Sequence, residues 1–191
     1  MNTMSDQVSI CNAALSMIGA DSIQSLDDSN KNARHCANIY EQTRKSLLRK
    51  HVWNCAVKRI QLAPLSVAPA FGLENAFQLP SDFIRVIQCN AYSYVVENRQ
   101  ILCNESVLQL RYVYDNKDES TWDDLLVEAM SLAMSSKLAK PITGNSTVAE
   151  AAFNELRILL KEARAINGQE YPSQTIDPDF SSTLLGARFG G

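Results

Sequence analysis

The spacing of apolar residues changes twice along the 191-residue chain, and this change limits the fold more than any other feature. Near both ends, apolar residues recur every three or four positions, which is the spacing of one face of an α-helix. Between about residues 53 and 115 they instead form short runs rich in β-branched and aromatic residues, separated by polar corners. The sequence therefore predicts helices at both ends of the chain and a β region between them.

Two helices are expected before the β region. The first covers residues 6–18, with Ser5 as its N-cap and Gly19 in the left-handed conformation after its last turn. The second follows a polar connector and runs from about residue 33 to His51, with one apolar face and a charged outer face.

Two more helices are expected after the β region. Ser120 is positioned to cap the third helix and Pro141 to stop it. Thr147 and Glu150 have the spacing of a capping box for the fourth helix, which Gly168 would end. The predicted core side of this last helix consists of Ala149, Ala152, Phe153, Leu156, Leu159, Leu160 and Ala163.

The middle of the chain is expected to form one small antiparallel sheet. Connections of only a few residues join its runs, so that consecutive strands are predicted to pair with one another. Residues 52–62 show a mixed alternation, and the prolines at positions 64 and 69 then bracket a loop. The predicted strands cover 83–89, 92–96, 100–103 and 107–114.

Together these patterns predict an α+β fold. A four-helix unit formed from both ends of the chain, residues 1–52 and 116–168, would carry an inserted small antiparallel β region, residues 53–115. Residues 169–191 would form an extended C-terminal tail.

The tail combines prolines, glycines and small polar residues with six large apolar side chains. It is too polar to form a core of its own, yet a purely solvated segment is not expected to keep so many large apolar groups. We predict that it docks on a partner in extended form; the alternative is that it folds back over its own domain. Its apolar anchors are Tyr171, Ile176, Phe180, Leu184, Leu185 and Phe189.

Charge is slightly acidic overall but locally basic. Eighteen Lys and Arg against 21 Asp and Glu give a net charge of −3, which provides no general attraction for nucleic acid. Six cations nevertheless lie in a stretch where residues 43–73 contain no acidic residue, and we call them the basic strip. They either pair with carboxylates of this chain or of a neighbouring subunit, or face phosphates. The basic strip consists of Arg44, Lys45, Arg49, Lys50, Lys58 and Arg59.

The chain is expected to work in a reducing compartment. Its five cysteines include no C-x-x-C pair, so that free, mostly buried thiols are predicted rather than disulfides or a zinc ribbon. Neither a basic, apolar leader nor an apolar stretch of membrane-spanning length is evident. We therefore expect a soluble protein without a signal peptide.

Motifs for catalysis are missing from the sequence. It contains no glycine-rich phosphate loop and no G-x-S-x-G, and neither His35 nor His51 has a metal-ligand spacing. The expectation is therefore no catalytic residue, no metal and no cofactor. A pair of carboxylates across a cleft would be enough for a glycosidase, which stays open as an alternative. The paired carboxylates are Asp27 with Asp28, Asp123 with Asp124, and Asp177 with Asp179, and the first two pairs flank predicted helix starts, where negative charge is favoured.

Particular residues suggest a family. Residues 11–15 (CNAAL), 76–86 (AFQLPSDFIRV) and 141–144 (PITG), together with Trp53-Asn54 and Lys58-Arg59, resemble the tail tubular protein A family of short-tailed bacteriophages. The resemblance covers roughly residues 5 to 166. One departure is Val52, where the family pattern has proline; this changes how the second helix would end, because valine permits a break that proline would fix.

The resemblance implies a head-to-tail adaptor of the virion that is not an enzyme. Family members form a ring, typically a dodecamer, between the portal protein and the nozzle of the short tail, and the genome passes through it during ejection. This implies self-association, portal and nozzle as partners, DNA in the lumen without specific binding, no membrane contact, and assembly in the host cytoplasm. Besides the glycosidase, a DNA-contacting packaging or closure module is the remaining alternative.

Overall fold

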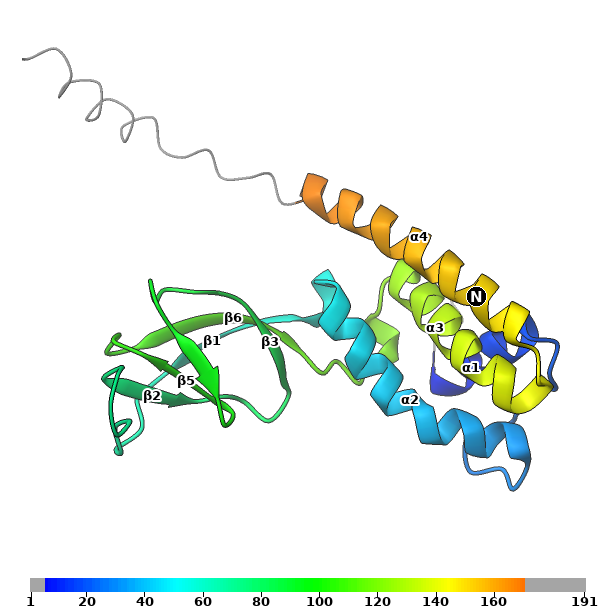
Figure 1. Cartoon of the computed structure of the whole chain (residues 1–191), viewed down its shortest axis with the longest axis horizontal. Helices are drawn as coiled ribbons and strands as arrows, with labels where there is room; N and C mark the ends of the chain where they lie inside the picture. The colour runs from blue at the N-terminus through cyan, green and yellow to red at the C-terminus, as the bar shows by residue number, and fades with distance from the viewer. Residues whose placement is uncertain (1–5, 171–191) are drawn as a thin grey trace, which may run out of the picture. The chain divides into compact units, whose positions relative to one another are not determined.

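The computed structural model describes residues 6–170, which contain four α-helices and two three-stranded antiparallel sheets (Figure 1). The fold is therefore mixed α+β. Helices α1 (Gln7–Met17) and α2 (Lys31–Lys50) precede the strands, and α3 (Asp124–Thr143) and α4 (Ser146–Glu170) follow them. The chain divides into two compact units after Leu160, within α4. All contacts described below lie within the first unit.

Helix α3 packs against both α1 and α2. Its sequence is apolar around most of its circumference, which is typical of a helix buried among others. Two buried serines interrupt this surface, and their hydroxyls donate to helix carbonyls: Ser131 to Val127 at 3.0 Å and Ser135 to Leu132 at 2.9 Å. The largest fully buried side chains of these three helices are Ile10, Leu15, Leu47, Leu48, Leu126, Met130, Met134 and Leu138.

The ends of α3 differ from the prediction. Asp123, not Ser120, is its N-cap and accepts from the backbone N–H of Leu126 at 2.7 Å, whereas Ser120 lies in a preceding 3₁₀ turn (Glu119–Thr121). Pro141 lies inside the last turn and does not stop the helix. Gly144 ends it with a φ of 72°, a conformation that glycine adopts without steric cost.

Helices α1 and α4 also have caps other than those predicted. The N-cap of α1 is Asp6, which forms a capping box with Ser9, and the predicted cap Ser5 lies outside the described residues. Before α4, the side chain of Asn145 accepts from the backbone N–H of Thr147 at 2.9 Å, which replaces the predicted Thr147–Glu150 box. Helix α4 also continues past Gly168 to Glu170.

The core side of α4 is only partly as predicted. Ala152, Leu156, Leu159, Leu160 and Ala163 are buried and Ala149 is half-buried, but Phe153 keeps 49% of its surface exposed. Helical periodicity places Phe153 beside the buried residues on the surface of the helix. It does not show whether another element covers that side of the helix. An aromatic side chain therefore remains on the outer surface of α4.

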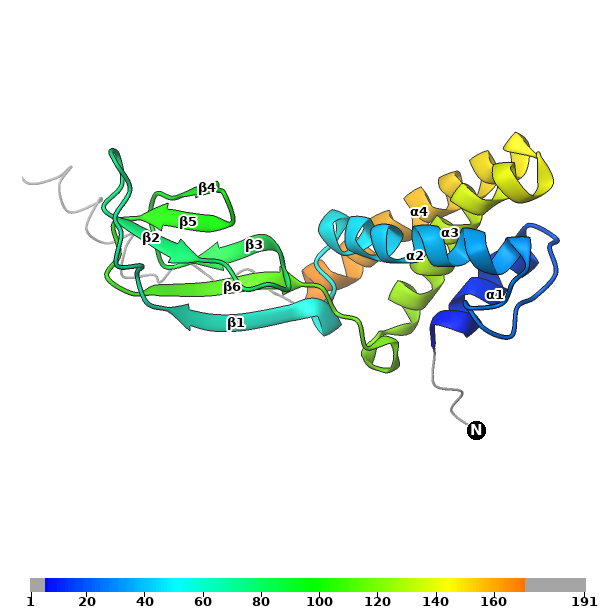
Figure 2. The same ribbon diagram turned by 90° about the horizontal axis from the view of Figure 1, so that it is seen from below.

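The strands form two sheets rather than the single sheet expected from the sequence, and Figure 2 shows them as two layers. The strand order is β1-β6-β3 in one sheet and β2-β5-β4 in the other. Of the four strand pairs in the described residues, β4 with β5 is the one pair whose strands follow each other in the sequence. The strands are β1 (Val57–Leu62), β2 (Asn75–Gln78), β3 (Phe83–Cys89), β4 (Val95–Glu97), β5 (Gln100–Cys103) and β6 (Leu108–Tyr114).

A separate apolar core explains why pairing does not follow chain order. Side chains from both layers meet in this core, with Phe77 and Ile101 from one sheet and Leu110 and Tyr112 from the other. Burying these side chains favours two facing sheets over one open sheet. The predicted strand at 92–96 shortens to β4, and β2 was not predicted.

Candidate functional site

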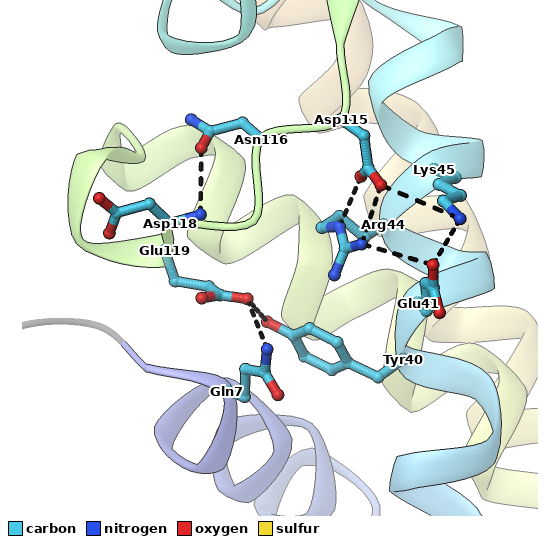
Figure 3. A network of polar contacts seen from close by, with 9 residues as sticks. All are labelled: Gln7, Tyr40, Glu41, Arg44, Lys45, Asp115, Asn116, Asp118 and Glu119. Carbon is cyan, nitrogen blue, oxygen red and sulfur yellow. Dashed lines mark hydrogen bonds and ion pairs between the residues drawn. The ribbon is translucent and has the colours of Figure 1, made fainter. Parts of the chain in front are cut away.

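The chain crosses between helices and sheets twice, after α2 and after β6, and a polar network lies at this junction (Figure 3). Its centre is an ion pair between Arg44 of α2 and Asp115, the residue after β6. Arg44 Nε lies 2.9 Å from Asp115 Oδ1, and a terminal guanidinium nitrogen lies 3.2 Å from Oδ2. The side chains are only 4% and 8% exposed. Two parallel hydrogen bonds in a buried place fix both distance and orientation.

Two charged neighbours extend this ion pair toward solvent. Lys45 pairs with Glu41 one turn earlier in α2, and its ammonium lies 3.9 Å from Asp115 Oδ2. Glu41 also lies 4.0 Å from the guanidinium of Arg44. Arg44 and Lys45 of the basic strip are therefore both engaged with carboxylates of this chain.

A second cluster ties the segment after β6 to α1 and α2. Glu119 is buried and accepts hydrogen bonds from the hydroxyl of Tyr40 and the side-chain amide of Gln7, each at 3.1 Å (Figure 3). Burial, with the nearby Glu119 charge as the next cause, raises the pKa of Tyr40 well above its ordinary value. Tyr40 therefore remains a hydrogen-bond donor at physiological pH.

Asn116 connects the two crossings directly. Its amide donates to the carbonyl of Cys55 and to the hydroxyl of Thr121, each at 2.8 Å, and its side-chain oxygen accepts from the N–H of Asp118 at 3.1 Å. The hydroxyl of Tyr114 donates to the same Cys55 carbonyl at 3.2 Å. Both connecting segments are thus held to each other and to α2, and the junction is braced rather than a simple tether.

Two of the other four cations of the basic strip contact residues of the β region. Lys58 pairs with Asp82 at 2.7 Å and lies 3.8 Å from the ring centroid of Tyr114. Arg49 donates to the carbonyl of Ile84 at 2.6 Å. Lys50 and Arg59 are exposed. The six cations therefore do not form one continuous face, because Arg44 is buried and two others are paired with carboxylates.

Asp82 links this part of the strip to the β core. Besides its pair with Lys58, it accepts from the hydroxyl of Tyr112 at 3.1 Å. Burial, followed by this hydrogen bond, raises the pKa of Tyr112 to about 12.

A cationic hollow of about 710 Å³ lies between α2 and β3. We call it the α2–β3 cleft. It brings Lys45 and Arg49 of the strip together with Arg99 and Lys117, two cations far away in the sequence. Sequence reasoning missed Arg99 and Lys117 because they lie at a turn and in a connecting segment. The acidic residues of the lining are Asp82 and Asp115.

An apolar groove of about 480 Å³ lies on the outer side of the second sheet. Leu65, Val67 and Phe71 of the loop before β2 face it, together with Val95 of β4 and Leu102 of β5. Phe71 is 89% exposed and Val67 77% exposed, which is unusual for side chains of this size. Within the described residues, β4 pairs only with β5 and so lies at the edge of its sheet. This groove is the clearest candidate for contact with another molecule.

Several residues that were considered for catalysis cap a helix, accept hydrogen bonds from the backbone or pack in the core. Asp123 caps α3, and Asp28 accepts from the backbone N–H groups of Gln24 and Ser25. His51 is buried and packs edge-on against Trp53, with ring centroids 4.6 Å apart. The tail anchors and the Asp177–Asp179 pair lie outside the described residues.

The five cysteines lie in the described part of the chain and are free, three of them buried, which confirms the prediction of thiols. Among residues 6–170, no three potential ligands are grouped as a metal ion would require. No helix in that range is both long enough and apolar enough to cross a membrane. Comparison with models of protein families and with curated proteins finds no match for the chain.

Proposed function

We propose that this chain is a structural virion protein, a head-to-tail adaptor that forms a ring between portal and tail nozzle and lets the genome pass during ejection. The observation that carries the proposal is the exposed apolar groove of the second sheet, held on the helices by a junction of buried ion pairs and hydrogen bonds. Such an arrangement presents a binding surface in a defined orientation. The resemblance to the tail tubular protein A family is the reason for proposing the tail nozzle as the partner of this surface.

In this proposal the helices and the β region have different partners. The helices of the first unit, α1 to α3 and α4 as far as Leu160, pack side by side with their copies through head-to-tail contacts that close after a fixed rotation. The β region faces the nozzle, where Val67 and Phe71 of the groove would be covered. The basic strip provides charges for contacts between copies rather than a continuous track for DNA, because Arg44 already has a buried partner.

The C-terminal tail is assigned to the portal. Its six apolar anchors, from Tyr171 to Phe189, would become ordered only on docking, so that the ring assembles on the portal and not before. The net charge of −3 per copy, repeated around a ring, would discourage the passing DNA from adhering.

The tail assignment is tested by deleting residues 169–191 and measuring whether the truncated protein joins tailless heads. The proposal expects heads that remain without an adaptor, while the truncated protein keeps the helical content of the full chain. Normal joining by the truncated protein would contradict the assignment.

A further inference from the structure

We propose that the α2–β3 cleft binds the acidic segment 176–180 of a second copy of this chain. The cleft has walls from α2 and from the start of β3, with Lys45 and Arg49 on the first and Phe83 and Ile84 on the second. Cationic groups therefore face the same hollow as the exposed part of Phe83, whose ring also stacks against Tyr112 in the β core. An occupant that fits it combines carboxylates with apolar side chains.

The acidic residues of the cleft are already neutralised from outside it. Asp115 is held by two hydrogen bonds from the buried Arg44, and Asp82 pairs with Lys58 at 2.7 Å. Neither Arg44 nor Lys58 lines the cleft. Among the cations that do line it, Lys45 pairs with Glu41 and lies 3.9 Å from Asp115, so the excess of positive charge comes from Arg49, Arg99 and Lys117.

Two guanidinium groups supply most of this excess. Arg49 donates to the carbonyl of Ile84 at 2.6 Å, and Arg99 donates to those of Pro80 at 2.8 Å and Ser81 at 3.3 Å. A carbonyl orients a guanidinium without cancelling its charge, and each group has further N–H donors for a carboxylate. Both side chains are thus positioned as anion receptors before any ligand arrives.

The backbone at Arg99 supports its placement. Arg99 has a φ of 57°, a left-handed conformation that few residues other than glycine adopt. It occupies the turn between β4 and β5, where its carbonyl also accepts from the N–H of Leu79 at 3.0 Å. The turn therefore holds this arginine against residues 79–81 at the rim of the cleft.

The chain itself contains a segment of matching chemistry. Residues 176–180 read Ile-Asp-Pro-Asp-Phe, and no lysine or arginine occurs from 171 to 187. Asp177 and Asp179 would meet the guanidinium groups, while Ile176 and Phe180 would lie against Phe83. An arm that enters the next copy makes a head-to-tail contact, the kind a ring requires. The inference rests on the proposed ring; it assigns Ile176 and Phe180 to the neighbouring copy and leaves Tyr171, Leu184, Leu185 and Phe189 as the anchors on the portal.

The test is zero-length cross-linking of full-length protein assembled on the portal protein, where electron microscopy first checks that a ring has formed, so that a missing ring is distinguished from a missing cross-link. Isotopically heavy and light copies are mixed and treated with a carbodiimide, which joins a lysine amine to a carboxylate in contact with it. Mass spectrometry should then find Asp177 or Asp179 joined to Lys45 or Lys117, with one peptide heavy and the other light. Arg49→Gln retains every reactive group yet weakens the docking, so the yield of these heavy–light products should fall about tenfold.

Arg59→Gln is the matched control, because Arg59 is an exposed strip arginine that does not line the cleft. It should leave the yield unchanged, and circular dichroism of both variants checks that they fold. Products within one copy only, products at other lysines, or an equal loss in both variants would overturn the inference. Binding of duplex DNA that Arg49→Gln abolishes, without the cross-links, would assign the cleft to nucleic acid and also overturn it.

Discussion

Arg44 in α2 and Asp115 after β6 form a two-bond ion pair that is almost completely buried, 71 positions apart in the sequence. This pair joins the helices to the returning end of the β region. Together with the hydrogen bonds of Tyr114 and Asn116 to the carbonyl of Cys55, it holds the β region in a fixed orientation.

Arg44→Ala should lower the free energy of unfolding by about 3–5 kcal/mol, because it leaves the Asp115 carboxylate buried without its partner. Urea denaturation measures the loss. Lys45→Ala is the control: it removes a half-exposed neighbour from the same network and should leave the stability nearly unchanged. Equal losses in the two variants would contradict the central role of the buried pair.

Tyr40→Phe should cost about 1.5–3 kcal/mol, because Glu119 loses one of its two side-chain donors in a buried place. Thermal and urea unfolding both report this change. Tyr92→Phe removes the same hydroxyl from a fully exposed side chain and should have no effect. If Tyr40→Phe is as stable as the parent protein, the hydrogen bond to Glu119 is unimportant.

The thiol of Cys55 should react slowly at neutral pH. Burial raises its pKa to about 11, so the fraction of reactive thiolate is small at pH 8 and grows about tenfold for each pH unit below 11. Alkylation with iodoacetamide, followed site by site by mass spectrometry, gives the profile. In urea the rate should reach half of its maximum near pH 8.5, as for an ordinary cysteine. A half-maximal rate near pH 8.5 in the folded protein would show that burial does not suppress ionisation here.

Val67→Ser with Phe71→Ser should weaken binding to the nozzle without unfolding the chain, because both side chains are mainly exposed. Co-sedimentation of the variant with nozzle protein measures the effect. Ile158→Ser, an exposed apolar residue on α4, should bind normally. Retained binding by the double variant would place the nozzle contact elsewhere.

Local patterns were enough to locate the four helices, because each has a sustained apolar face. Their caps were less predictable: Asp123 and Ser120 both precede α3 and both can cap a helix, and only packing selects between them. Strand pairing depended on Phe77 and Ile101 meeting the other sheet across a common core, a long-range effect that connection length does not reveal.

Much of the candidate site could not be predicted from the sequence. The basic strip was visible as a run of cations. Which of these cations are paired depended on Asp115 and Asp82, which lie far from Arg44 and Lys58 in the sequence. Arg99 and Lys117 carry no local pattern at all. The one available signal was Asp115-Asn116 directly after an apolar strand, where polar side chains often connect two parts of a fold.

An adaptor must assemble into a ring on the portal, and electron microscopy of the protein mixed with the portal protein shows whether this chain does so. We expect a closed ring of copies seated on the portal, with the β regions on the side away from it. Portal particles that remain bare at saturating concentrations of the protein would contradict the adaptor function.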